Sequence, residues 1–324
     1  MAPLSETMQS ALLELLRCPF CRAELAAAGA TLECPGCGRS FAVEDGIPLM
    51  LHEDLPGARE KLVEAAGWPA KAQAEGWYEV DDEIDSHLPF LTRDLGWEDQ
   101  GWIANEHSFQ ALLDDFIGAR RGLRVLEVGA AKAWAAPYWR ERGCEYVATD
   151  ILVDPNIGLG RGSFFGEFAR VQADGEHLPF ADSSFDVAYC IATLHHALDL
   201  GAMVRELARV VRPGGLVAAL NEGTRGVFRS GENPEQEAEK ALGINEHVHT
   251  VWTYLACFRR AGLRIERIER ADGRPPESPG GKLVHVPVVG PRLAILAHLS
   301  HKPYGGVTIF ARRVGRRRPA ATNS

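Results

Sequence analysis

Four cysteines near the start of the chain have a spacing that suits a metal ion. Cys18 and Cys21 form one C-x2-C pair, Cys34 and Cys37 form a second, and twelve residues separate the pairs. Four thiolates held in two such hooks are the usual donors of a tetrahedral structural zinc site. Two disulfides are the alternative, which we disfavour because nothing else in the sequence indicates secretion. A segment this short would also need the metal to stabilise its fold.

Histidines form two further groups that could do acid–base chemistry. His195 and His196 follow a predicted buried strand in ATLHHALD, whereas Glu246, His247 and His249 lie in the loop before a predicted helix. An imidazole titrates near neutral pH, so each histidine is a candidate catalytic base. The alternative for the adjacent pair is a structural role, in which the two side chains brace their loop. The second group is predicted to be a base, half of a metal site, or a solvated loop.

The elements that would position these side chains alternate between strands and helices. Apolar runs of strand length recur from residue 123 onward, and amphipathic helical segments separate several of them. This alternation predicts an α/β fold with a doubly wound, mostly parallel, seven-stranded Rossmann-like sheet. The predicted strands are residues 123–128, 145–151, 170–175, 185–193, 216–223, 263–270 and 305–313.

The carboxyl ends of these strands are the expected place for a ligand, as in other open α/β sheets. Gly129 opens the loop after the first predicted strand. Loops that hold a nucleotide cofactor usually carry glycine at alternate positions, but Ala131 and Ala133 stand at the next two. Asp150 and Asp174 stand at the ends of the second and third strands. We therefore expect a cofactor at this edge of the sheet.

Residues 125–219 resemble the class I S-adenosylmethionine (SAM) methyltransferases, in particular their small-molecule, type-11-like group. The resemblance rests on VLEVGAAKA, VATD, ADGEHLPFADSSFDVAYCIATLHH and ARVVRPGGLV, in this order. It implies that Asp150 accepts hydrogen bonds from the ribose hydroxyls and that Asp174 accepts one from the adenine amino group. It also implies that Glu127 sets the loop and faces the cationic end of the ligand. The expected cofactor contacts are Glu127, Gly129, Ala131, Asp150, Ile151, Asp174, Gly175 and Ile191.

Residues 16–51, which end in VEDGIPLML, resemble small bacterial zinc-ribbon proteins and the zinc-ribbon activator of tRNA methyltransferases. The resemblance implies association with a methyltransferase, here fused in the same chain. A separate protein partner that docks through the ribbon is the alternative. Residues 1–55 contain three Arg, no Lys and eight Asp or Glu. Together with the negative charge of a Zn(Cys)4 centre, this composition opposes binding to a phosphate backbone.

The whole chain has 35 basic and 44 acidic residues, a net charge of −9, which is not typical of a nucleic-acid-binding protein. No run approaches the ~18 apolar residues of a membrane span, and the sequence shows no signal peptide. We therefore expect a cytoplasmic protein without membrane contact. The expected domains are a zinc ribbon at 1–55, a Trp-rich helical connector or lid at 56–118, a methyltransferase domain at 119–315 and a disordered basic tail at 316–324.

Gly-Trp occurs four times in the connector. Each tryptophan is expected either to pack the ribbon onto the next domain or to cover a substrate, with packing favoured. The features together predict an enzyme that uses SAM to methylate an O or N atom of a small molecule, such as a sugar or a natural-product-like intermediate. SAM and a structural Zn²⁺ are the expected cofactors. The alternatives are an rRNA or tRNA base methyltransferase, and a non-catalytic partner protein that binds SAM weakly. The candidate catalytic residues are His247, His249, His195 and His196.

Overall fold

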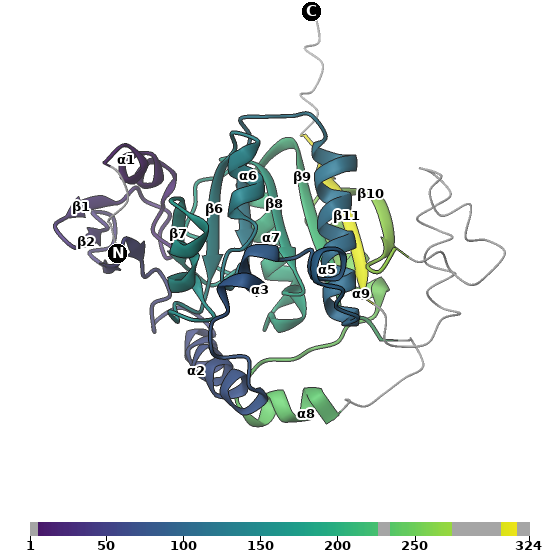
Figure 1. Cartoon of the computed structure of the whole chain (residues 1–324). Helices are drawn as coiled ribbons and strands as arrows, with labels where there is room; N and C mark the ends of the chain where they lie inside the picture. Colours follow the sequence, from purple (N-terminus) through teal and green to yellow (C-terminus); the bar gives the residue numbers. More distant parts are fainter. Residues whose placement is uncertain (1–5, 226–233, 274–305, 316–324) are drawn as a thin grey trace, which may run out of the picture.

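The computed structural model describes residues 6–225, 234–273 and 306–315. A seven-stranded sheet forms its centre, with the strand order β10-β11-β9-β8-β5-β6-β7 (Figure 1). Strands β7, β6, β5, β8 and β9 are parallel, whereas β11 runs antiparallel to both β9 and β10. The predicted fold class and all seven predicted strands are confirmed. The strands are β5 (Arg124–Val128), β6 (Glu145–Asp150), β7 (Ala169–Gln172), β8 (Phe185–Ile191), β9 (Val211–Glu222), β10 (Leu263–Arg270) and β11 (Val307–Arg313).

Two apolar cores lie on opposite faces of the sheet, because successive side chains of a strand point to opposite sides. On β5, Leu126 and Val128 belong to one core and Val125 to the other. The first core contains the buried faces of α7 (Leu200–Val210) and α9 (Val251–Arg260). The second contains α6 (Ala136–Glu141), α5 (Gln100–Ala111) and the π-helical turn that continues α5, Leu112–Ile117. The sheet is thus covered on both faces, as the buried strand sequences predict.

The N-terminal module contains a short helix and four short strands, and it lies against the β7 edge of the large sheet (Figure 1). Leu16 forms an antiparallel bridge with Phe180, and Leu49 forms a parallel bridge with Gln172 on β7. Apolar side chains of the module join the first core of the large sheet. The module therefore shares a core with the domain beside it. Its elements are α1 (Glu6–Leu15), β1 (Ala26–Ala28), β2 (Thr31–Glu33), β3 (Ser40–Glu44) and β4 (Ile47–Pro48).

The connector is helical, and its longest helix, α2, lies beside α8 at the end of the sheet where the cofactor loops are expected (Figure 1). Lys71 of α2 forms a buried ion pair with Glu239 of α8. No helix among the described residues is long and apolar enough to cross a membrane. The basic tail predicted at 316–324 lies outside the described residues. The connector helices are α2 (Ala58–Glu75), α3 (Asp82–His87), α4 (Leu91–Leu95) and α5, and α8 spans Pro234–Ala241.

Candidate functional site

A cavity of about 250 Å³ opens at the carboxyl ends of β5, β6 and β8. Its walls come from the loops after these strands and from the connector helix α2. This position agrees with the general rule for ligand sites in open α/β sheets. Seven of the eight predicted cofactor contacts line it, namely Gly129, Ala131, Asp150, Ile151, Asp174, Gly175 and Ile191.

The loop after β5 adopts a left-handed backbone at every position where a glycine was expected. The φ angles are 74° at Gly129, 46° at Ala131 and 58° at Ala133. A Cβ atom on Gly129 would lie 2.3 Å from the Thr193 side chain, so only glycine fits there. The two alanines take up backbone strain that glycine would avoid. Strain of this kind is common where a loop is shaped for a ligand.

Two backbone N–H groups, from different loops at the cavity, hold the Asp150 carboxylate in place. The N–H of Ala131 donates to Asp150 Oδ2 at 2.7 Å, and the N–H of Leu152 donates to Oδ1 at 2.9 Å. Burial raises the pKa of this carboxyl group, and the backbone N–H donors partly oppose the shift. Each oxygen keeps a further lone pair that can accept a hydrogen bond from a ligand hydroxyl.

Asp174 is the second acid at the cavity and is 3% exposed. Its Oδ1 accepts the N–H of Glu176 at 3.0 Å, and its Oδ2 lies 2.7 Å from Nδ1 of His177. The hydrogen bond to Asp174 raises the pKa of His177 despite burial. These contacts fix the carboxylate at the cavity wall, where it can accept a hydrogen bond from a ligand.

Glu127 does not line the cavity, which corrects the prediction that it faces the ligand. Its side chain is buried beneath the loop, where Tyr146 and Tyr189 donate their hydroxyl groups to Oε2. Burial raises the pKa of Glu127 to about 7. Because residues on β5 alternate between the two faces, Glu127 points into the core with Val125. The other half of the prediction, that Glu127 sets the loop, stays a prediction.

The connector supplies four lining residues that sequence reasoning did not assign to the site: Lys61, Glu64 and Trp68 of α2, and Trp77 just after the end of that helix. Lys61 Nζ donates to the carbonyl oxygen of His196 at 2.7 Å and lies 3.4 Å from Glu64 Oε2. Burial raises the pKa of Glu64 to about 7, although Lys61 opposes the shift. Two of the four Gly-Trp tryptophans therefore border the cavity. The repeated Gly-Trp pairs were the available signal, but nothing in their spacing distinguished these two.

The predicted histidines separate into two places. His196 lines the cavity, and the ring of Trp68 meets its ring edge-on with centroids 5.4 Å apart. His195 lies beside it, and its Nδ1 contacts Glu222 Oε2 at 2.9 Å. Burial lowers the pKa of His196 well below its usual value, and His195 adds to this effect. His247 and His249 do not line the cavity.

Glu246 joins His195 and His196 rather than its neighbours in sequence. Its Oε2 lies 3.7 Å from Nε2 of His195 and 3.6 Å from Nδ1 of His196. Among the described residues, the predicted half-site of Glu246, His247 and His249 is not one of the groups with converging donor atoms. The path of the chain explains this difference. The backbone N–H of His247 donates to the carbonyl oxygen of His195, whereas the His247 side chain is not among the converging donors His195, His196 and Glu246.

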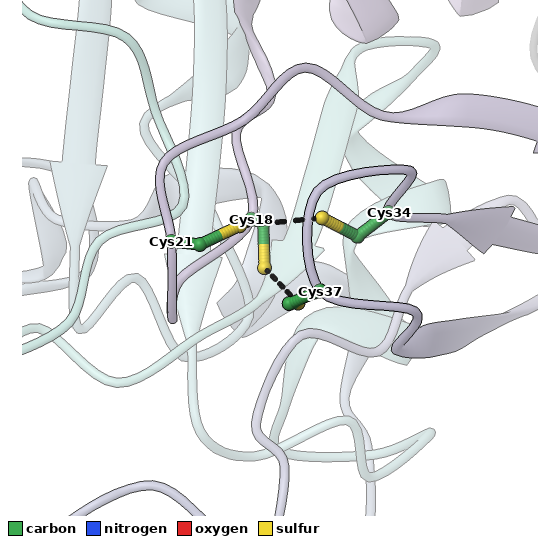
Figure 2. A group of neighbouring side chains, drawn as sticks. All are labelled: Cys18, Cys21, Cys34 and Cys37. Carbon is green, nitrogen blue, oxygen red and sulfur yellow. Dashed lines mark hydrogen bonds between the residues drawn. The ribbon is translucent and has the colours of Figure 1, made fainter.

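The four N-terminal cysteines converge as predicted (Figure 2). Cys18 Sγ lies 3.6 Å from Cys37 Sγ, and Cys21 Sγ lies 3.4 Å from Cys34 Sγ. Zn–S bonds of about 2.3 Å in a tetrahedron separate neighbouring sulfurs by about 3.8 Å. All four cysteines are free thiols, so the two-disulfide alternative is wrong for this structure. The donor set and its spacing fit a zinc ion.

Comparison with known proteins agrees with both resemblances. Residues 126–219 match the family described as "Methyltransferase domain", and residues 9–46 match the family described as "Trm112p-like protein". The predicted resemblances are confirmed over these residues. Residues 126–219 are thus similar to methyltransferase domains, and residues 9–46 are similar to Trm112p-like proteins.

Two curated relatives and one solved structure show how far the similarity extends. The malonyl-[acyl-carrier protein] O-methyltransferase of Pseudescherichia vulneris is 37% identical over 102 residues, 32% of this chain and 40% of that protein. Methyltransferase GfsG of Streptomyces halstedii is 33% identical over 152 residues, 44% of this chain and 54% of that protein. The matches therefore span about half the length of these relatives or less.

The solved structure is geranyl diphosphate C-methyltransferase from Streptomyces coelicolor A3(2), in complex with Mg²⁺, geranyl diphosphate and S-adenosyl-L-homocysteine. It is 14% identical, covers 80% of this chain and 100% of its own, and superposes with a TM-score of 0.53. At this identity the match shows a shared fold.

Proposed function

We propose that the protein transfers the methyl group of SAM to an O or N atom of a small molecule. The observation that carries the proposal is the cavity in which Asp150, Asp174 and the Gly129 loop meet. SAM would lie with its ribose at Asp150, its adenine at Asp174 and Ile191, and its methionine end at the Gly129 loop. SAM supplies a sulfonium-bound methyl group, so the protein needs mainly to align the acceptor and take up its proton.

His196 is the candidate base that the cavity favours, because it is the one of the four predicted histidines that lines the wall. Burial lowers the pKa of His196, which favours the neutral ring over the imidazolium. The ring is held by Trp68 on one side and by the carbonyl oxygen of Asn245 at Nδ1. In the proposed step the acceptor forms its bond to the methyl carbon, the C–S bond breaks, and the acceptor proton leaves to a base in the cavity.

A small-molecule acceptor fits the charge of the protein. Helix α2 forms part of the cavity wall with Lys61 and Trp68. The net charge of −9 and the acidic ribbon oppose the binding of RNA. The names of the two curated relatives also point to methyl transfer, in one case to a carrier-bound malonyl group.

The ribbon is proposed to bind one structural zinc through Cys18, Cys21, Cys34 and Cys37. Its proposed partner is the methyltransferase domain of the same chain. Arg22 supports this, because Nη1 donates to the carbonyl oxygen of Leu178 at 2.6 Å and Nη2 lies 3.0 Å from Glu206 of α7. Free cysteines at the metal site also suit the reducing cytoplasm, which is the proposed location.

The acceptor class can be tested with methyl-labelled SAM. The protein is incubated with three separate acceptor pools from cells, namely a low-mass filtrate, total RNA, and protein. We expect label in the low-mass pool, and none from the Asp150→Ala variant. Asp182→Ala removes an exposed carboxylate that pairs with Arg209 outside the cavity, and it should label like the unaltered protein. Label in RNA alone would overturn the small-molecule assignment, and no transfer to any pool would favour the non-catalytic alternative.

A further inference from the structure

Beside the cofactor cavity, two histidines and a glutamate bring donor atoms together from distant parts of the chain. His195 and His196 lie on the single turn Leu194–His196 after β8, and Glu246 lies before α9. One donor atom from each residue lies within 4.8 Å of the others. The side chains of both histidines are largely buried, with 13% and 16% exposed, and that of Glu246 is 9% exposed. Two imidazoles and a carboxylate form a donor set that first-row transition metals prefer.

A second layer of contacts orients the His195 ring. Its Nδ1 lies 2.9 Å from Oε2 of the fully buried Glu222. Glu222 is itself fixed, since its Oε1 accepts the N–H groups of Thr193 and Leu194 at 3.1 and 3.0 Å. A carboxylate that holds Nδ1–H leaves Nε2 with the lone pair, and Nε2 is the atom directed at Glu246. Metal-binding histidines are commonly oriented in this way.

The charges around the three residues favour a bound cation. The two buried ammonium groups nearby form ion pairs with carboxylates outside this group of three residues. Lys61 pairs with Glu64, and Lys71 pairs with Glu239. The carboxylate of Glu222 lies at Nδ1 of His195, and that of Glu246 lies at Nε2. Buried carboxylates are costly unless a positive charge or hydrogen bonds compensate them. A single imidazole supplies at most one positive charge between these two acids.

We propose that His195, His196 and Glu246 bind a divalent first-row transition metal at the edge of the cofactor cavity. Metal–ligand bonds of about 2.0–2.1 Å in a tetrahedron place neighbouring donors about 3.4 Å apart. Glu246 lies 3.7 and 3.6 Å from the two histidine nitrogens, and all three donor atoms lie within 4.8 Å of one another, so the three side chains must move closer together when the ion binds. Binding through Nδ1 of His196 exchanges its hydrogen bond to the carbonyl oxygen of Asn245 for a bond to the cation.

The position of His196 gives such a cation a role in the proposed reaction. Because His196 also lines the cavity, the metal would lie where it can hold an oxygen of the acceptor and orient it. This role rests on the proposed function, whereas binding of the metal does not. With the cation bound, His196 is a metal ligand instead of the base named above. The cation would then make the acceptor hydroxyl more acidic, and the proton released on methyl transfer would pass to water.

The proposal is tested by adding Co²⁺ to protein whose ribbon is loaded with zinc. Co²⁺ bound by imidazole and carboxylate absorbs in the visible range without the thiolate charge-transfer bands that a cysteine site gives. We expect about one Co²⁺ per chain with the first kind of spectrum. Glu246→Gln and His195→Ala should each weaken binding at least about 10-fold. His247→Ala is the matched control on the same loop, and it should bind Co²⁺ like the unaltered protein.

Two further measurements keep the outcomes distinct. Circular dichroism melts show whether each variant is folded, and calorimetry with SAM shows whether the cofactor site is intact. No Co²⁺ bound at millimolar concentration would overturn the metal site while leaving SAM binding to be judged separately. Thiolate charge-transfer bands, or unchanged affinity in folded Glu246→Gln, would also overturn it, because the ion would then lie elsewhere.

Discussion

At the scale of single residues, the loop after β5 keeps a cofactor-binding shape with only one glycine. Gly129 is required by the contact that a Cβ would make with Thr193. Ala131 and Ala133 adopt the same left-handed backbone at a cost in strain. Ala131 is exposed while Ala133 is fully buried, so their methyl groups contribute differently to packing. The loop geometry is therefore retained by its surroundings rather than by glycine alone.

Ala131→Gly should raise the free energy of unfolding by about 0.5–1 kcal/mol. Relief of the left-handed strain stabilises the folded state by about 1–2 kcal/mol. The greater conformational freedom of glycine in the unfolded chain opposes this gain by about 0.4–1 kcal/mol. Ala135→Gly is the control, because Ala135 has φ −73° and is fully buried. That change should destabilise the protein. Denaturant unfolding of both variants decides the matter, and equal destabilisation by the two would show that Ala131 is not strained.

At the scale of helices and strands, the inner strands of the central sheet, such as β5 and β8, were predictable because they are buried and mostly apolar. The edge strand β10 is only partly buried and contains charged residues. The acids at the strand ends were predictable for the same reason, since the end of each apolar run marks the sheet edge. Asp150 and Asp174 accordingly reach the cavity as expected. Glu127 does not line the cavity, because it points to the face of the sheet where Tyr146 and Tyr189 donate their hydroxyl groups to it. The sequence of β5 does not show which face holds these tyrosines.

The contribution of α2 could not be predicted, because it depends on contacts between distant parts of the chain. Lys61 and Trp68 meet His196 across more than a hundred residues of sequence. Glu246 likewise lies close to His195 and His196, although His247 and His249 are nearer to it in sequence. Local spacing favours the neighbours, whereas the path of the chain before α9 brings Glu246 to the strand end.

Gly67→Ala should loosen α2 and weaken SAM binding on the order of 10-fold. A Cβ at Gly67 would lie 2.4 Å from the carbonyl oxygen of Leu242 and 3.1 Å from the Ile244 side chain. The helix must then shift from the segment that follows α8, although alanine itself favours a helix. Gln73→Ala changes an exposed residue of the same helix and should bind SAM normally. Calorimetry gives the affinities, and equal values for the two variants would refute a cofactor-covering role for α2.

At the scale of the whole molecule, the ribbon and the domain beside it share one apolar core. Leu16 and Met50 of the ribbon share one apolar core with Phe180 and Val171 beside β7. The N–H of Met50 also donates to the carbonyl oxygen of Gln172 on that edge strand, at 2.9 Å. The ribbon thus covers a sheet edge that would otherwise expose unpaired backbone groups. We therefore expect loss of the metal to destabilise the large sheet as well as the ribbon.

Cys21→Ser should remove the bound zinc and lower the melting temperature of the whole chain, on the order of 10 °C for a loss of several kcal/mol. Elemental analysis should find about one zinc per chain before the change. Cys257→Ser alters a half-buried cysteine outside the ribbon and should keep both the zinc and the melting temperature. The melt is followed by circular dichroism of the helices. An unchanged melt in zinc-free protein would mean that the ribbon does not stabilise the domain beside it.

The central claim is that SAM binds in the cavity bordered by Asp150, and calorimetric titration tests it most directly. SAM and S-adenosylhomocysteine should both bind the unaltered protein. Asp150→Ala should weaken binding of each by about 1–3 kcal/mol, because charge-assisted hydrogen bonds to the ribose are lost. Asp182→Ala should bind both ligands like the unaltered protein. Failure of either ligand to bind at millimolar concentration, or equal affinities for Asp150→Ala and the unaltered protein, would contradict the account.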